Sequence, residues 1–307
     1  MIGVRYFCRI AAALAMLILF TGFAAAQNEY HDNTPDEALG KPVNQMTANL
    51  ALLQAAEKGW EDEIEKLLAG GAKVAARNRF GSTPLLLAAG GGHRKAVKML
   101  LAAESDINHR NIGGSTALIL AAEGGHARIA KMLIEAGAFV DHANNKGVSA
   151  MTAAAYNGDD DVIELLLAQG VDPNYIDRTG KSAIVYAAAK GFTDTVRLLL
   201  AAGVEADARY GNNLTVLMWA AGHANDVPVG DGVATVTVLV EAGATLDLQD
   251  NRGRTALMVA ASLDHAESAE ALLKAGARAD IADNEGKTAR DLAAGEGVLA
   301  VLAANGQ

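Results

Sequence analysis

A short phrase recurs along this chain at a fixed distance of 33 residues. Each copy is a Thr or Ser, then Pro, Ala or Val, then Leu, Ile or Met, and five copies begin at Thr83, Thr116, Ser149, Ser182 and Thr215. A further copy begins at Thr255 and a partial one, Thr288-Ala289, follows, after steps of 40 and 33 residues. Such a period is typical of a solenoid, in which one supersecondary unit is copied and each copy packs on its neighbours.

Residues 78–110 show how one unit folds. Gly81 suits a turn, Thr83 can cap a helix through its hydroxyl, and Pro84 suits the first helical position. Three glycines at residues 90–92 end this helix. A second helix is predicted from near His93, with apolar side chains on one face at Ala96, Val97, Leu100 and Leu101.

Neither helix is long enough to be stable alone, because isolated helices shorter than about 12–15 residues are marginal in water. A pair of alanines in each first helix lets neighbouring units approach closely. Eight such pairs predict eight units, and the pairs begin at Ala55, Ala88, Ala121, Ala154, Ala187, Ala220, Ala260 and Ala293.

With these motifs the sequence resembles the ankyrin repeat, whose unit is a turn followed by two antiparallel helices. The matching features are the Thr-Pro-Leu phrase, the Ala pair, the Gly92-His93 step, and the Leu-Leu-x-x-Gly-Ala ending at Ala277. The resemblance implies an all-α solenoid of helix-turn-helix units joined by β-hairpin turns, and a general use in protein binding. The expected units are residues 47–77, 78–110, 111–143, 144–176, 177–209, 210–249, 250–282 and 283–307.

Some positions depart from that pattern. The signature histidine after the phrase is replaced in every unit, for example by Leu86 and Ile119. Glu104 stands where most other units have glycine, and a left-handed conformation there would cost roughly 1 kcal/mol. Asn213 replaces a hairpin glycine, which is a milder change because Asn tolerates that conformation.

The first residues have the layout of a secretory signal peptide, with Arg5 and Arg9 before an apolar run and three alanines at 24–26. We therefore predict a signal peptide at residues 1–26 and a flexible linker at 27–46. An uncleaved anchor is the alternative, since such apolar runs overlap short membrane spans in length. Cleavage would remove the only cysteine, Cys8, and predicts a periplasmic or secreted protein with no membrane contact.

The charge of the chain limits its partners. The formal net charge is −10, and it becomes −12 when Arg5 and Arg9 are lost with the signal peptide. This acidic balance argues against nucleic acid, because phosphate binding rests on clustered Lys and Arg. The expected partner is another protein, and the expected state is a monomer.

The 40-residue step places seven extra residues between the two helices of unit six, within residues 222–232. This polar, turn-rich segment is the kind of loop in which binding residues concentrate. Candidate contact residues in it are His223, Asp226 and Asp231. The alternative is a tolerated surface insertion, since lengthening a loop costs little free energy.

A second candidate is the concave face, formed in ankyrin-like solenoids by hairpin tips and inner helices. Seven tip residues are Lys or Arg and one is acidic, which suggests a basic edge for an acidic protein surface. The alternative is that these charges only keep the edge soluble. The candidates are Arg79, Phe80, Ile112, Lys146, Arg178, Lys181, Leu214, Arg252 and Arg254 at the tips, and Tyr156, Asn157 and Lys190 at inner-helix ends.

No catalytic or cofactor motif accompanies the repeat. Asp159, Asp160 and Asp161 fit the acidic first turn of a helix better than a metal site. His93, His126 and His265 repeat at the start of the second helix, which indicates a structural role. No metal, cofactor or catalytic residue is therefore predicted.

The sequence thus predicts a non-catalytic scaffold that binds another protein. Within that class it could assist a periplasmic enzyme, or act as an inhibitor or immunity-type protein that blocks a secreted effector. The competing hypothesis is a ligand-binding protein or enzyme that uses the Gly222–Gly232 loop.

Overall fold

The computed structural model describes residues 44–224 and 226–305. The predicted signal peptide and residues 27–43 of the predicted linker lie outside this range. The last residues assigned to the linker need correction, because Gln45 and Met46 begin a helix that the side chain of Asn44 caps. Within the described residues, no helix combines the length and the apolar character that crossing a bilayer requires.

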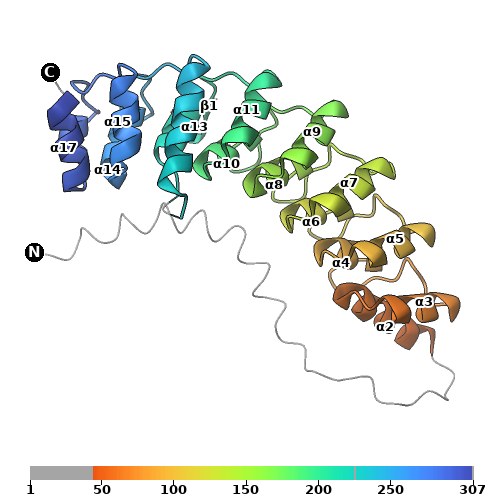
Figure 1. The fold of residues 1–307 in the computed structure, drawn as a ribbon. Coiled ribbons are helices and arrows are strands. Elements are labelled where there is room, and N and C mark those ends of the chain that lie inside the picture. Colours follow the sequence, from red (N-terminus) through yellow and green to blue (C-terminus); the bar gives the residue numbers. More distant parts are fainter. Residues whose placement is uncertain (1–43, 225, 306–307) are drawn as a thin grey trace, which may run out of the picture. The chain divides into compact units, whose positions relative to one another are not determined.

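The helices of the described region form eight successive pairs, as the repeat predicted. A first-helix row and a second-helix row run side by side (Figure 1). The first-helix row consists of α2 Gln45–Lys58, α4 Pro84–Gly90, α6 Ala117–Glu123, α8 Ala150–Asn157, α10 Ala183–Ala189, α12 Val216–Ala221, α14 Ala256–Leu263 and α16 Ala289–Leu292. The second-helix row consists of α3 Glu61–Ala69, α5 Arg94–Ala102, α7 Ala127–Glu135, α9 Asp160–Ala168, α11 Thr193–Ala201, α13 Val229–Glu241, α15 Ala266–Lys274 and α17 Glu296–Asn305.

The recurring phrase starts the first helix of its unit. The hydroxyl of Thr83 accepts a hydrogen bond from the Leu86 backbone N–H at 3.4 Å, and Pro84 is the first helical residue. Thr116, Ser149, Thr215 and Thr255 cap their helices in the same way. These caps satisfy backbone donors that a helix start leaves unpaired, so the phrase fixes the same boundary in each of these units.

The core lies between the two rows and continues from unit to unit. The Ala pairs of the first-helix row from Ala55 to Ala261 are fully buried. In the six second helices from α5 to α15, one leucine each contributes to a buried column through the stack, made of Leu100, Leu133, Leu166, Leu199, Leu239 and Leu272. The first-helix row lines the concave side of the arc that the stacked pairs form (Figure 1).

Backbone hydrogen bonds join the hairpin tips of neighbouring units. The N–H of Ile112 donates to the Phe80 carbonyl at 2.9 Å, and the N–H of Asn284 donates to the Arg252 carbonyl at 2.9 Å. The turns contain little regular strand. In the part of the chain that is described, β1 Arg209–Tyr210 and β2 Leu214–Thr215 pair antiparallel around a short 3₁₀ turn at Gly211–Asn213.

The unit-six insertion differs from the loop that its composition predicted. The loop ends at Pro228, and residues 229–232 are the first turn of α13. Helix α13 has 13 residues where α11 has 9, so four of the seven extra residues lengthen the helix. Pro228 and Asp231 were assigned to a loop because both residue types are common in turns. Both also suit the start of a helix, because Pro lacks the backbone N–H that would be unpaired there and the Asp charge favours the positive helix end.

Glu104 is left-handed, with φ of 58°, which is the conformation whose cost was considered from its place in the repeat. Glycines at the equivalent positions of other units, such as Gly71 and Gly137, also have positive φ. The Glu104→Gly variant is therefore expected to be more stable by about 0.5–1 kcal/mol, because the strain of a side chain in this conformation is removed. Urea unfolding followed by circular dichroism would measure the gain. Glu104→Ala is the control: it keeps a Cβ atom, and an equal gain there would contradict the strain explanation.

Candidate functional site

The repeated histidines at the start of the second helices connect neighbouring units. The ring of His93 donates to the Glu57 carbonyl at 2.8 Å, and the ring of His126 donates to the Gly90 carbonyl at 3.1 Å. His265 bonds the Ala221 carbonyl at 2.9 Å in the same manner. Each bond satisfies the end of a first helix in the preceding unit, so the structural interpretation of these histidines fits the geometry.

His223 was predicted as a contact residue of the insertion, and this prediction was wrong. Its side chain is buried and stacks on His265, with ring centroids 4.0 Å apart and planes 3° from parallel. In unit six, Gly232 occupies the repeat position that His265 has in unit seven. A Cβ atom on Gly232 would meet the His223 ring at 2.3 Å. The histidine from the insertion thus fills the space that the slot's own glycine leaves open.

The stacked pair predicts an acid-sensitive region. Burial lowers the pKa of His265; the Ala221 carbonyl, Asp264 and Glu267 oppose this shift, whereas His223 adds to it. His265 therefore takes up a proton more readily in the unfolded chain, whose ordinary histidine pKa is about 6.5. Its contribution to stability is present above that pH and is lost as the pH falls below it.

We expect the melting temperature of the wild type to fall more between pH 7.5 and pH 5.5 than that of a His265→Phe variant. Phe is a suitable replacement because Phe192 occupies the same slot in unit five. Calorimetry at both pH values measures the difference. Equal losses in the two proteins would show that His265 is not the acid-sensitive group.

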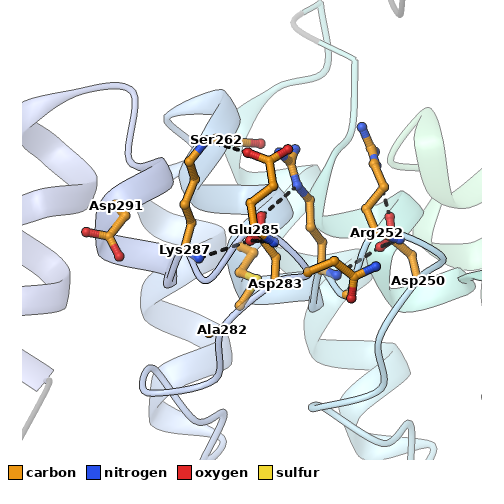
Figure 2. Close-up of polar contacts among 12 residues, drawn as sticks. Asp250, Arg252, Ser262, Ala282, Asp283, Glu285, Lys287 and Asp291 are labelled. Carbon is orange, nitrogen blue, oxygen red and sulfur yellow. Dashed lines mark hydrogen bonds and ion pairs between the residues drawn. The ribbon is translucent and has the colours of Figure 1, made fainter.

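The basic hairpin tips of the last two units are paired with carboxylates. Arg252 Nε lies 3.5 Å from Asp250 Oδ2, and Lys287 Nζ lies 2.6 Å from Glu285 Oε2 (Figure 2). Arg254 Nε lies 3.5 Å from Asp283 Oδ2. Asp250 and Asp283 were left out of the sequence-based count of tip charges, so this part of the edge is less basic than predicted.

The other predicted contact residues lie in different surroundings. Phe80 and Ile112 are exposed, and the Arg79 guanidinium lies 4.7 Å from the Phe80 ring centroid. Leu214 packs against the core. The partly buried Asn157 donates from its amide to the Ala122 carbonyl at 2.7 Å, so it links two units. Arg178, Lys146 and Asp231 are exposed.

Three predicted contact residues, Tyr156, Lys181 and Lys190, lie close to Tyr186 and Trp219, which were not predicted. We call this group the aromatic–lysine cluster. It consists of Tyr156, Lys181, Tyr186, Lys190 and Trp219, from units four to six. Lys181 Nζ lies 5.7 Å from the Tyr186 ring centroid and 5.5 Å from that of Trp219. Lys190 Nζ lies 5.3 Å from the Tyr156 centroid, and the Tyr156 and Tyr186 rings meet edge to face at 6.1 Å. These are favourable cation–π and aromatic geometries.

Asp177 fixes the position of two cluster residues, Lys181 and Tyr186, through hydrogen bonds. Its buried carboxylate accepts the Tyr186 hydroxyl, the Thr179 hydroxyl at 2.7 Å, and the backbone N–H groups of Thr179 and Lys181 at 2.7 and 3.1 Å. Burial raises the pKa of Tyr186, and the bond to Asp177 adds to the shift. Burial lowers the pKa of Lys181, which the charge of Asp177 opposes.

Glu123 lies one repeat before Tyr156, at the end of α6. Burial raises its pKa to about 7, against the opposing effects of Lys146 and of a 3.3 Å hydrogen bond from Asn144. The carboxyl group at the end of α6 therefore changes charge near neutral pH.

The structure also bears on metal chemistry. Within residues 44–224 and 226–305, no group of three or more His, Cys, Asp or Glu side chains is arranged to hold a metal ion. Asp160 and Asp161 lie in the first turn of α9, where carboxylates favour the positive helix end. Burial raises the pKa of Asp159, the residue just before this helix.

These features define the class of the protein. It is an all-α repeat solenoid whose first-helix row carries aromatic and charged side chains along a concave face, an arrangement suited to contact with a large partner. A family model described as ankyrin repeats in three copies matches residues 23–111, 103–177, 151–229 and 229–307. The chain belongs to the ankyrin repeat family, whose members generally bind other proteins and are typically non-catalytic. No curated protein sequence matches the chain.

Proposed function

We propose that this chain is an exported, monomeric, non-catalytic scaffold that binds another protein along its concave face, in the periplasm or outside the cell. The aromatic–lysine cluster carries the proposal. Tyr and Trp side chains on a rigid surface are among the groups enriched where binding energy concentrates, and the two lysines add positive charge beside them. The signal-peptide layout of residues 1–26 supports export.

The partner that best fits this cluster presents an acidic surface. Lys181 and Lys190 lie over aromatic rings in the cluster, and exposed Lys146 and Arg178 lie on the neighbouring tips. A complementary negative surface would be steered towards this part of an otherwise acidic chain. The paired basic residues Arg252, Arg254 and Lys287 of the last two units make the C-terminal tips a weaker candidate.

Two roles of such a scaffold remain candidates. It could stabilise or assist an exported enzyme, or it could block a secreted effector as an inhibitor or immunity-type protein. A catalytic role of the Gly222–Gly232 segment has less support, because His223 is stacked in the interior and Asp226 is engaged by Lys190.

The binding proposal can be tested with a photo-crosslinking amino acid placed at Arg178, beside the cluster, in the native cell. We expect one defined protein adduct after illumination. The control places the same amino acid at Lys131, an exposed residue of α7 in the second-helix row, and should give none. Identifying the adduct and assaying it with and without the scaffold separates the assisting role from the inhibiting one.

A second variant checks that the cluster itself binds. Lys181→Glu together with Lys190→Glu should reduce the Arg178 adduct by about tenfold, because two favourable charge contacts become repulsive. The circular dichroism spectrum should stay the same. Adducts of equal yield from Arg178 and Lys131, or a yield insensitive to the charge reversal, would refute the concave-face proposal.

Export has its own test. N-terminal sequencing of the protein from the periplasm or medium should give a chain beginning at Gln27. A chain found only in the cytoplasm would contradict export without affecting the binding proposal.

A further inference from the structure

The unit-six insertion places an acidic side chain on the aromatic–lysine cluster. Asp226 Oδ2 lies 3.3 Å from Lys190 Nζ, and Lys190 in turn lies over the Tyr156 ring. The Asp226 side chain is 72% exposed, whereas that of Lys190 is 23% exposed. The other units from one to seven have only two or three residues between their helices, for example three at residues 190–192. The inserted residues therefore supply this carboxylate.

Other contacts of the insertion hold it against unit five. The Ala224 N–H donates to the Ala189 carbonyl at 3.0 Å. Val227 is buried, and its side chain fills the space beside Gly191, where an added Cβ atom would meet it at 2.6 Å. On the other side, His223 is stacked on His265 of unit seven. Ala224 and Val227, on either side of Asp226, are thus held by contacts with neighbouring units.

A carboxylate from another molecule could take the place of Asp226 at Lys190. Because the Asp226 carboxylate is mostly in solvent, water and salt screen its attraction to Lys190, and breaking the contact costs little. The lysine is held in place by its aromatic neighbour, whereas the aspartate is mostly in solvent. A carboxylate from outside that approached Lys190 would meet the same cation and ring, and would need to displace one exposed side chain.

We propose that Asp226 is a built-in competitor for acidic partners: in the free protein it occupies the position at Lys190 that a partner carboxylate takes in the complex. This inference rests on the proposed function and deepens it, because it names the partner chemistry as a carboxylate-rich segment. The competitor lowers affinity for any acidic chain, and only a partner with further contacts to the cluster overcomes it.

The test measures binding of a fluorescein-labelled peptide of ten glutamates to the mature full-length protein by fluorescence anisotropy, at low ionic strength. The Asp226→Asn variant should bind about threefold more tightly than the wild type, the gain expected when an exposed ion pair no longer competes. Asp194→Asn is the matched control. It makes the same change of charge on the exposed surface of α11, in the second-helix row, and should change the affinity by less than half as much.

A double variant tests whether the gain acts through Lys190. Lys190→Met should weaken binding, and adding Asp226→Asn to it should give no further gain. Equal affinities of the Asp226→Asn and Asp194→Asn variants would overturn the inference while leaving binding by the wild type intact. Weaker binding by Asp226→Asn would also overturn it, because the aspartate would then assist the peptide. If no variant binds the peptide, the partner is not carboxylate-rich and the inference fails; the crosslinking experiment then decides the concave-face proposal by itself.

Discussion

Replacing Leu166 with Ala is expected to lower the free energy of unfolding by about 3 kcal/mol. Leu166 is fully buried in α9 and belongs to the leucine column that passes through the second-helix row. Helices α7 and α11 contact α9 from either side, so the space left by the lost side chain cannot close easily. The cost therefore includes a cavity as well as the lost transfer free energy.

Urea unfolding followed at 222 nm measures this loss. Leu167→Ala is the matched control, because it removes the same atoms from a partly buried position of the same helix and should cost about half as much or less. Since each unit contacts only its neighbours, a weakened central unit should also make the two halves unfold less cooperatively. Equal losses for the two variants would show that the leucine column is not the main source of stability.

The second large effect is expected at Asp177. The Asp177→Ala variant should lose about 2–3 kcal/mol, because two backbone N–H groups and two hydroxyls lose a buried charged acceptor. The hairpin tip would lose the two hydrogen bonds that its backbone N–H groups make with Asp177. Tyr186 would lose the bond that fixes it within the aromatic–lysine cluster. Thermal and urea unfolding both measure the loss.

The chain offers its own control for this variant. Asn78 and Asn144 occupy the same turn position, and each accepts two backbone N–H groups through its side-chain oxygen. Asp177→Asn keeps these acceptor bonds and should cost less than about 1 kcal/mol. If Asn were as damaging as Ala, the negative charge of Asp177, and not the turn bonds, would be the stabilising feature.

The period in the sequence predicted the helix pairs, their caps and the position of the insertion, because each depends on local residue chemistry that recurs at every copy. The same register marked Glu104 as standing at a glycine position, and its φ is positive. The turn acids Asp177, Asp250 and Asp283 were missed, although their register with Asn78 and Asn144 was available as a signal.

The candidate site was only partly predictable. Lys181, Lys190 and Tyr156 were found as tip and helix-end residues. Tyr186 and Trp219 were not among the predicted contact residues, although both lie at equivalent first-helix positions 33 residues apart. His223 was misjudged because its neighbours in space, Gly232 and His265, are set by how a seven-residue insertion folds back, which no repeat pattern encodes.

The insertion has a consequence for how such a gene can change. A solenoid in which each unit touches only its neighbours tolerates duplication or deletion of whole copies. The border between units five and six is an exception, since Ala224 and Val227 bind Ala189 and Gly191 across it. Recombination that separated units five and six would remove the contacts that Ala224 and Val227 make with unit five. We therefore expect the two units to be duplicated or lost together.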